Sequence, residues 1–173
     1  MASVRLTGTS PSPFFSAAIQ FSSRTFLILR ASLSTASSQL ICCHLSLPGA
    51  RYSGVFTRSR ITGESPKTGP DIEGMQVEVD PTRHTGGIYE SGGRGWVALP
   101  TPEGERAIKP RDWNELEVRA EGRHIVTRLN GVQIVDYNDP TLRFTEGVIG
   151  LQLHTGGGVK VRFKDISIRD LSK

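Results

Sequence analysis

The chain has 173 residues, of which 36% are hydrophobic, and this is enough material for one domain with a buried core. Its net charge of +4 comes from the first third, because residues 1–63 carry six arginines and no acidic residue, whereas the other 110 residues hold 15 basic and 17 acidic residues. Arginines scattered through a serine-rich segment do not form the one-sided basic surface of a nucleic-acid-binding domain, so nucleic acid is excluded as the partner.

Residues 1–49 are interpreted as a Ser/Arg-rich extension of low order. They contain eleven serines and no Asp or Glu, which is typical of an organellar transit peptide, although an extension without a folded role fits equally. Arg24 and Arg30 bracket an apolar run too short for a secretory signal, and no stretch is long enough to span a bilayer. Cys42 and Cys43 are adjacent, so they supply neither a disulfide framework nor a thiolate metal site.

The first strands of the fold are expected just after residue 50. Residues 52–59 have an apolar centre typical of a strand, and a loop rich in Gly and Pro follows at 63–70. In residues 75–80, Met, Val and Val alternate with Gln, Glu and Asp. Side chains of a strand point alternately to its two faces, so one face can join a core while the other carries an amide and two carboxylates.

A glycine-rich hairpin follows this strand. Residues 86–89 are predicted to form a strand, and the loop 90–95 presents Arg94 and then Trp96, which starts a further short strand. Residues 99–112 hold three prolines and are predicted to be a long loop.

The pattern is clearest in the second half. Residues 114–120 and 123–129 alternate in polarity, and 132–137 follows them after Asn130-Gly131, the most favoured two-residue hairpin turn. Further strands are predicted over 148–155 and 159–168.

The last strand changes parity between Phe163 and Ile166, which indicates a β-bulge near Asp165. No window after Glu64 has helical periodicity. Many short strands separated by turns predict an all-β protein with an antiparallel β-sandwich.

Five segments follow one another in a characteristic order. They are YSGVF at 52–56, GMQVEV at 74–79, GGIYESGGRGW at 86–96, DWNELEVRAEGRHIVTRLNGVQIVDY at 112–137 and GVIGLQLHTGGGVKVRFKDISI at 147–168. In this order they resemble the 3-keto-disaccharide hydrolase domain family, a concanavalin A-like lectin/glucanase jelly roll, with Tyr52 where the family usually has Asn. The resemblance implies a domain over residues 50–173.

The resemblance also implies an N-terminally truncated copy, because family members usually have several strands before YSGVF and residues 1–49 show nothing similar. A sandwich that lacks those strands would expose apolar edges. The family suggests a periplasmic or secreted location, although no secretory signal is readable here.

Within this resemblance the polar strand faces gain a chemical role. Gln76 and Glu78 share one face, and Gln152 and His154 share a face of a later strand. If both line the concave side of the jelly roll, Glu78 and His154 form the catalytic pair and the two amides bind sugar hydroxyls. A 3-keto sugar has an acidified hydrogen at C2, so Glu78 or His154 would act as the base while an acid assists departure of the glycosidic group.

Three further residues are candidates for substrate binding. Arg94 would stabilise negative charge on the keto oxygen, and Tyr89 or Trp96 would stack on a pyranose ring. The ordinary alternatives stay open: a solvated polar face, a tryptophan that packs at an edge, and an arginine in a loop ion pair.

No cofactor is expected, and the histidines are too far apart in the sequence to indicate zinc. Carboxylates such as Glu73, Glu78 and Asp80 could hold a calcium ion through oxygen ligands, but such a site is not expected. The first hypothesis is a hydrolase-type domain that cleaves glycosidic bonds of 3-keto-disaccharides, with a carbohydrate as partner. The alternatives are a non-catalytic carbohydrate-binding module and a nonfunctional fragment, since the fold does not decide function.

Overall fold

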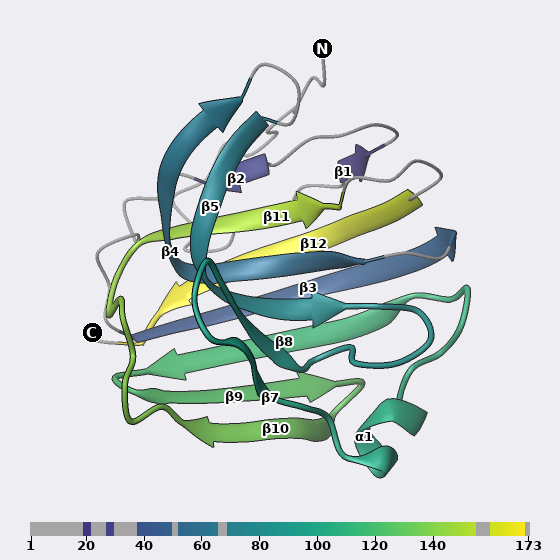
Figure 1. Cartoon of the computed structure of the whole chain (residues 1–173). Coiled ribbons are helices and arrows are strands. Elements are labelled where there is room, and N and C mark those ends of the chain that lie inside the picture. The colour runs from purple at the N-terminus through teal and green to yellow at the C-terminus, as the bar shows by residue number, and fades with distance from the viewer. Residues whose placement is uncertain are drawn as a thin grey trace.

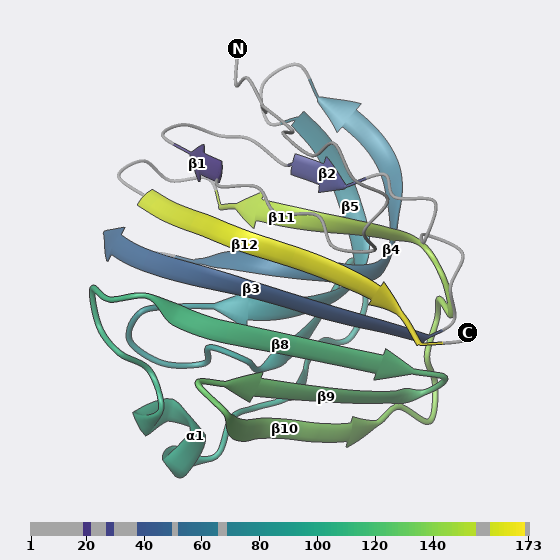
Figure 2. The same ribbon diagram turned by 180° about the vertical axis from the view of Figure 1, so that it is seen from behind.

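The computed structural model describes residues 19–21, 27–29, 38–49, 52–65, 69–154 and 160–171. Within these residues the strands form two antiparallel sheets of six strands each, seen in Figure 1 and from behind in Figure 2. Sheet A has the order β1 (Ile19–Phe21), β12 (Lys160–Asp170), β3 (Ser38–Gly49), β8 (Asn114–Glu121), β9 (His124–Leu129) and β10 (Val132–Asn138). Sheet B has the order β2 (Leu27–Leu29), β11 (Val148–Leu153), β4 (Ser53–Ser65), β5 (Gly69–Val79), β6 (Ile88–Ser91) and β7 (Gly95–Ala98). The predicted antiparallel β-sandwich is confirmed.

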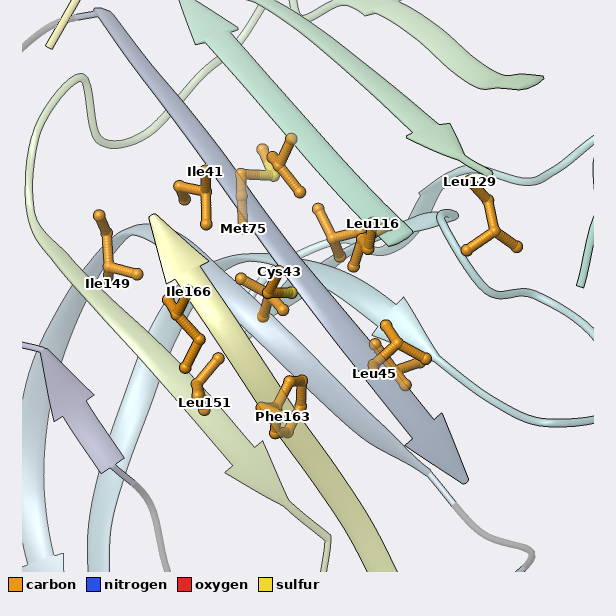
Figure 3. Packing of buried hydrophobic residues seen from close by; sticks show 14 of the residues in the cluster. Ile41, Cys43, Leu45, Met75, Leu116, Leu129, Ile149, Leu151, Phe163 and Ile166 are labelled. Atoms are coloured by element: carbon orange, nitrogen blue, oxygen red, sulfur yellow. The ribbon is translucent and has the colours of Figure 1, made fainter. Parts of the chain in front are cut away.

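One apolar core lies between the two sheets (Figure 3). Met75, Val77 and Val79 of β5 are at most 2% exposed and belong to it, which confirms the apolar face predicted for this strand. Sheet A contributes residues of β3, β8, β9 and β12, among them Leu45 and Phe163. The core therefore fixes which face of β5 is left for other uses.

The N-terminal boundary differs from the expected one at residue 50. β3 begins at Ser38 and lies between β12 and β8 in the middle of sheet A. Ile41 and Cys43 are both 1% exposed, and burial raises the pKa of the Cys43 thiol to about 12, so this cysteine serves as a small apolar core residue. The strand is hidden in the sequence because 40–43 is an unbroken apolar run, without the alternation that marks a half-buried strand. The rest of the expected extension lies outside the described residues, apart from β1 and β2.

Two turn predictions are confirmed. Asn130 and Gly131 have φ values of 52° and 82°, as the hairpin between β9 and β10 requires. Asp165 has φ 50°, and the register of β12 against β3 shifts between Lys164 and Ser167, so a bulge lies where the parity of the sequence changes.

The predicted loop over 99–112 contains a short helix, α1 (Pro102–Arg106). The Thr101 side chain caps it by accepting a hydrogen bond from the Gly104 N–H at 3.1 Å, and Pro102 occupies the first helical position. Five residues are too few to show helical periodicity, so only the cap could have indicated it. No helix in the described ranges has the length and apolar character needed to cross a membrane.

β4 and β5 are longer than predicted and curve together, as Figure 1 shows. The expected loop over 63–70 is short, because β4 continues to Ser65 and β5 starts at Gly69. The curvature accompanies a bulge in β4, where the register shifts between Thr57 and Arg60 and Arg58 adopts φ 49°. The buried Arg58 guanidinium donates a hydrogen bond to the carbonyl oxygen of Gly122, between β8 and β9, and so ties the two sheets together.

Candidate functional site

The outer face of sheet B, the face directed away from the core, carries most of the predicted site residues. Register places Gln152 of β11 opposite Gly54 of β4, and Gly54 opposite Glu78 of β5. These three residues form one row across the sheet, which we call the polar row. Side chains in such a row point to the same face, so Gln152 and Glu78 flank a position that has no side chain.

The next row along the strands is largely aromatic. Gly150, Phe56, Gln76, Tyr89 and Trp96 follow one another across β11, β4, β5, β6 and β7. We call it the aromatic row. Gln76 is its polar member and lies beside the polar row, so the structure brings Gln76, Glu78, Gln152, Tyr89 and Trp96 onto one face.

Glu78 is the most perturbed carboxyl of this face. It is 4% exposed, and Gln76 Nε2 donates a hydrogen bond of 2.9 Å to its Oε2. Burial raises the pKa of Glu78 to about 7, the negative charge of Asp80 adds to this rise, and the Gln76 hydrogen bond opposes it. A carboxyl with a pKa near neutrality can both take up and release a proton.

The second carboxyl oxygen of Glu78 is buried and has no partner among the described residues. Among the described residues Glu78 Oε1 has no hydrogen-bond partner, and the same is true of Gln152 Oε1 on the other side of Gly54. Buried polar atoms in native proteins almost always have a partner, so two unpartnered acceptors in one row mark a place where hydrogen-bond donors are lacking in the described part of the chain. Hydroxyl groups are donors of this kind.

An aromatic platform lies at the β7 end of the aromatic row. The ring centroids of Tyr89 and Trp96 are 5.4 Å apart in an edge arrangement, and the His84 ring lies 4.9 Å from that of Trp96. Trp96 is 39% exposed, so part of its surface remains available to a ligand. Rings held in this way at a surface suit the apolar face of a pyranose.

His154 is on the same side of the sheet but further along. It follows the end of β11, and its backbone N–H donates to the Tyr52 carbonyl oxygen at 3.2 Å. Its ring and that of Tyr52 are edge to face with centroids 6.0 Å apart. β4 separates His154 from Glu78, so at a spacing of about 4.8 Å between strands the two Cα atoms are at least about 10 Å apart. A substrate lying between them, rather than a direct hydrogen bond, would join the two.

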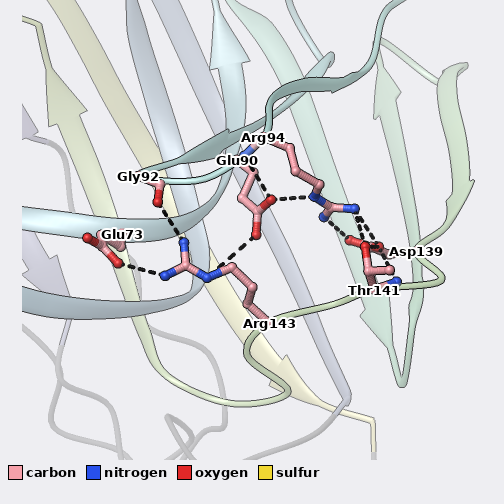
Figure 4. A network of polar contacts seen from close by, with 7 residues as sticks. All are labelled: Glu73, Glu90, Gly92, Arg94, Asp139, Thr141 and Arg143. Atoms are coloured by element: carbon pink, nitrogen blue, oxygen red, sulfur yellow. Dashed lines mark hydrogen bonds and ion pairs between the residues drawn. The ribbon is translucent and has the colours of Figure 1, made fainter.

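Arg94 corrects the sequence prediction, because it points to the other side of sheet B. Its partner Glu90 is opposite Met75 of the core face, and the Arg94 Nε donates to Glu90 Oε2 (Figure 4). Its Nη1 and Nη2 bind the two Asp139 oxygens at 3.0 and 2.6 Å, and Nη1 also donates to Thr141 Oγ1 at 2.7 Å. The guanidinium is thus committed to a network that links the β6–β7 turn to the end of β10.

The carboxylates considered for calcium do not gather at one point. Each of them has its own hydrogen-bond partner. Glu73 accepts a hydrogen bond from Arg143 Nη2 at 2.9 Å, and Glu78 accepts one from Gln76. Asp80 Oδ1 accepts a hydrogen bond from the Thr82 backbone N–H at 2.8 Å. In the part of the chain that the structure describes, no three His, Cys, Asp or Glu side chains are grouped as metal ligands.

Two residues of this face were missed from the sequence. His84 was not linked to Trp96, because their contact depends on how the 80–87 turn folds. Gly54 was passed over, although a glycine inside a strand often marks a close approach of another group. A Cβ at position 54 would lie only 2.6 Å from Gln76 Nε2, so the Gln76 side chain occupies the space that Gly54 leaves.

Solved structures share the fold at low sequence identity. A candidate glycosyl hydrolase from Parabacteroides distasonis matches with a TM-score of 0.62 and 17% identity over 89% of this chain and 80% of that one. The carbohydrate-binding module CBM66 from Bacillus subtilis matches with a TM-score of 0.58 and 15% identity over 96% and 94%. A Bacillus subtilis protein with a galectin-like fold matches with a TM-score of 0.57 and 11% identity over 98% of this chain and 87% of that one. At these identities the similarity establishes the fold.

Comparison with curated proteins gave no match. The model of the 3-keto-alpha-glucoside-1,2-lyase-like domain matches residues 31–169, which confirms the resemblance seen in the sequence and includes β3. The chain therefore belongs to the family of 3-keto-alpha-glucoside-1,2-lyase-like domains.

Proposed function

We propose that the outer face of sheet B binds a 3-keto-glycoside and that Glu78 is the base that starts cleavage of its glycosidic bond. The observation that carries the proposal is Glu78 itself: a buried carboxyl with one oxygen held by Gln76, the other without a hydrogen-bond partner among the described residues, and a pKa raised by burial to about 7. These are the properties expected of a general base that works near neutral pH.

The chemistry follows from the keto group. It acidifies the C2 hydrogen of the sugar, so Glu78 Oε1 takes this proton and the C2–H electron pair forms the C1=C2 double bond. The bond between C1 and the glycosidic oxygen breaks, and that oxygen gains a proton and leaves as an alcohol. Addition of water across C1=C2 then gives the net hydrolysis. His154, on the same face, is the proposed proton donor to the leaving oxygen.

The binding residues follow from the two rows. Gln152 Oε1 accepts a hydroxyl of the same sugar, beside Glu78 and above Gly54. Tyr89 and Trp96, at the β7 end of the aromatic row, bind the apolar face of a sugar ring. The family name and the glycosyl hydrolase neighbours support a carbohydrate as ligand.

Turnover of 3-keto-trehalose or 3-keto-lactose tests the proposal. Glu78→Gln keeps the size of the side chain and removes the base, so we expect kcat/KM to fall by about 100-fold or more. The matched control is Glu115→Gln on the exposed face of β8, which should leave kcat/KM unchanged. Full turnover by the folded Glu78→Gln protein would refute the assignment, and the pH profile of the wild type should rise through about pH 7 as Glu78 ionises.

A second candidate function is supported by the exposed Trp96 and by the fold shared with CBM66: a carbohydrate-binding module without catalysis. Saturable binding of the same sugars by the wild type, with no product after prolonged incubation, would favour the module over the enzyme. Undiminished turnover by His154→Ala would show that His154 is not the proton donor. The assignment of Glu78 as the base would not be affected.

A further inference from the structure

Gln76 is the one described residue that donates a side-chain hydrogen bond to Glu78, and its own position depends on Gly54. A Cβ built at position 54 would lie 2.6 Å from Gln76 Nε2, 2.7 Å from Cγ and 2.9 Å from Cδ. Contacts under 3.0 Å are not tolerated, so any side chain at position 54 would displace Gln76. Gln76 is 6% exposed and has little room to move elsewhere.

The amide of Gln76 decides which Glu78 oxygen is available. Its Nε2 donates to Oε2, which leaves Oε1 as the Glu78 oxygen without a hydrogen-bond partner among the described residues. A carboxyl without this donor would be free to rotate and would present either oxygen to either side. We propose that Gly54 and Gln76 are positioning residues, which hold the Glu78 carboxyl so that Oε1 alone faces the ligand.

This inference deepens the proposed function, on which its catalytic meaning rests, but its test needs no substrate. The Glu78 carboxyl lies beside Gln76 on its own strand and near Asp80 two residues further on. In the polar row, Gly54 follows on the neighbouring strand β4, and Gln152 on β11 beyond it. Asp80 is the charged group of this set, and neither Gly54 nor Gln76 titrates. A change in the Glu78 pKa on substitution of Gly54 or Gln76 therefore reports on the hydrogen bond.

The experiment is an NMR titration of the glutamate side-chain carboxyl carbons in the whole protein, with Glu78→Gln to assign the signal. Gln76→Met keeps the length of the side chain and removes the donor, so the Glu78 pKa should rise by about one unit. Gly54→Ala should produce a similar rise, because the displaced amide no longer reaches Oε2. Gly63→Ala is the matched control: it lies in the same strand, and its Cβ would meet only the exposed Asp71 side chain, 3.1 Å away.

The double variant Gly54→Ala/Gln76→Met separates the proposal from its main competitor. If Gly54 acts through Gln76, Gly54→Ala adds no further rise when Met is at position 76. If the alanine at position 54 instead acts by shielding Glu78 from water, Gly54→Ala would raise the Glu78 pKa equally with Gln or with Met at position 76. That result would overturn the proposal. An unchanged Glu78 pKa in folded Gly54→Ala or in Gln76→Met would overturn it as well. Absence of turnover on 3-keto-glycosides would refute the proposed function and leave these pKa results standing.

Discussion

Replacing Arg94 by Met tests the charge network of Figure 4. Arg94 is the shared partner of two buried carboxylates: the Glu90 side chain is 1% exposed and that of Asp139 is 0% exposed. Methionine keeps much of the length of arginine but donates no hydrogen bond. In Arg94→Met, Asp139 keeps the hydrogen bond from the Thr141 backbone. Glu90 keeps the backbone N–H of residue 94, 3.1 Å from its Oε2, and Arg143, whose Nε is 4.0 Å from its Oε1.

The size of the effect follows from these burials. Removing one partner of a buried ion pair typically costs about 3–5 kcal/mol, because the other charge is left buried without compensation. Arg94 itself is 35% exposed, so water screens part of the interaction. We therefore expect the free energy of unfolding to fall by about 3 kcal/mol, at the lower end of that range.

The loss should depend on pH. Burial alone would raise the pKa of Asp139, but hydrogen bonds from Arg94 and Thr141 outweigh it and hold this pKa below its usual value. Such a group stabilises the fold above its unfolded pKa of about 3.9, and the stabilisation disappears as the pH falls through the lower folded value. In Arg94→Met burial acts with less opposition, so the pKa of Asp139 rises. The difference between wild type and variant should be largest at neutral pH and shrink toward about pH 3.

Urea unfolding followed by tryptophan fluorescence, at about pH 7 and about pH 4, measures both effects. The control is Arg119→Met, which breaks the exposed pair of Arg119 with Glu121 and should leave stability unchanged. A loss for Arg94→Met no larger than that of the control, or a loss that is the same at both pH values, would refute the reasoning.

Four other variants test separate parts of the structure. Glu78 retains its proton up to about pH 7 in the folded protein and up to about pH 4.5 in the unfolded chain, so its contribution to stability falls by about 3 kcal/mol as the pH rises through this window. Glu78→Gln should abolish this decrease of the free energy of unfolding with pH. An equal decrease in the variant would contradict the burial argument. Gly147→Ala should lower the free energy of unfolding by about 2 kcal/mol or more, because φ is 152° and a Cβ would lie 2.3 Å from the Ser59 carbonyl oxygen. Gly131→Ala, with φ 82° and nothing within 4 Å, should cost only about 1 kcal/mol in the same chemical denaturation, so equal losses would contradict the clash. Trp96→Ala should weaken sugar binding by about tenfold in calorimetry with an unchanged thermal midpoint, and unchanged affinity would remove Trp96 from the site.

The sequence predicted the elements whose signals are local. Alternation and the Asn130-Gly131 turn specify the meander from β8 to β10, and the parity change in β12 locates the bulge at Asp165. β3 was missed because a strand in the middle of a sheet can carry apolar residues on both faces, which removes the period of two. α1 was missed because a five-residue helix has a cap but no periodicity.

The candidate site was predictable only as far as strand alternation reaches. The side of β5 that carries Gln76 and Glu78 follows from the period of two, and so does the side of β11 that carries Gln152. The partners of Arg94 do not follow from strand alternation, because Asp139 is 45 positions away in the sequence and comes close to Arg94 only through the packing of the two sheets. The raised pKa of Glu78 also requires the fold, since burial is its largest cause and an isolated strand would leave the carboxyl in water.

The bulge in β4 couples the stability of this fold to the geometry of its candidate site. β4 lies between β11 and β5, so the polar row forms only if β4 keeps its register with both neighbours. Gly74 and Gly147 lie against Ser59 at the bulge, where a Cβ on either would come within 2.8 Å of that residue. A slip of β4 by one residue would turn Val55 to the outer face and Gly54 to the core, which the apolar core resists. Loss of the bulge should therefore displace Gly54 from between Glu78 and Gln152, so Gly147→Ala is expected to lower turnover as well as stability although residue 147 is not in the polar row.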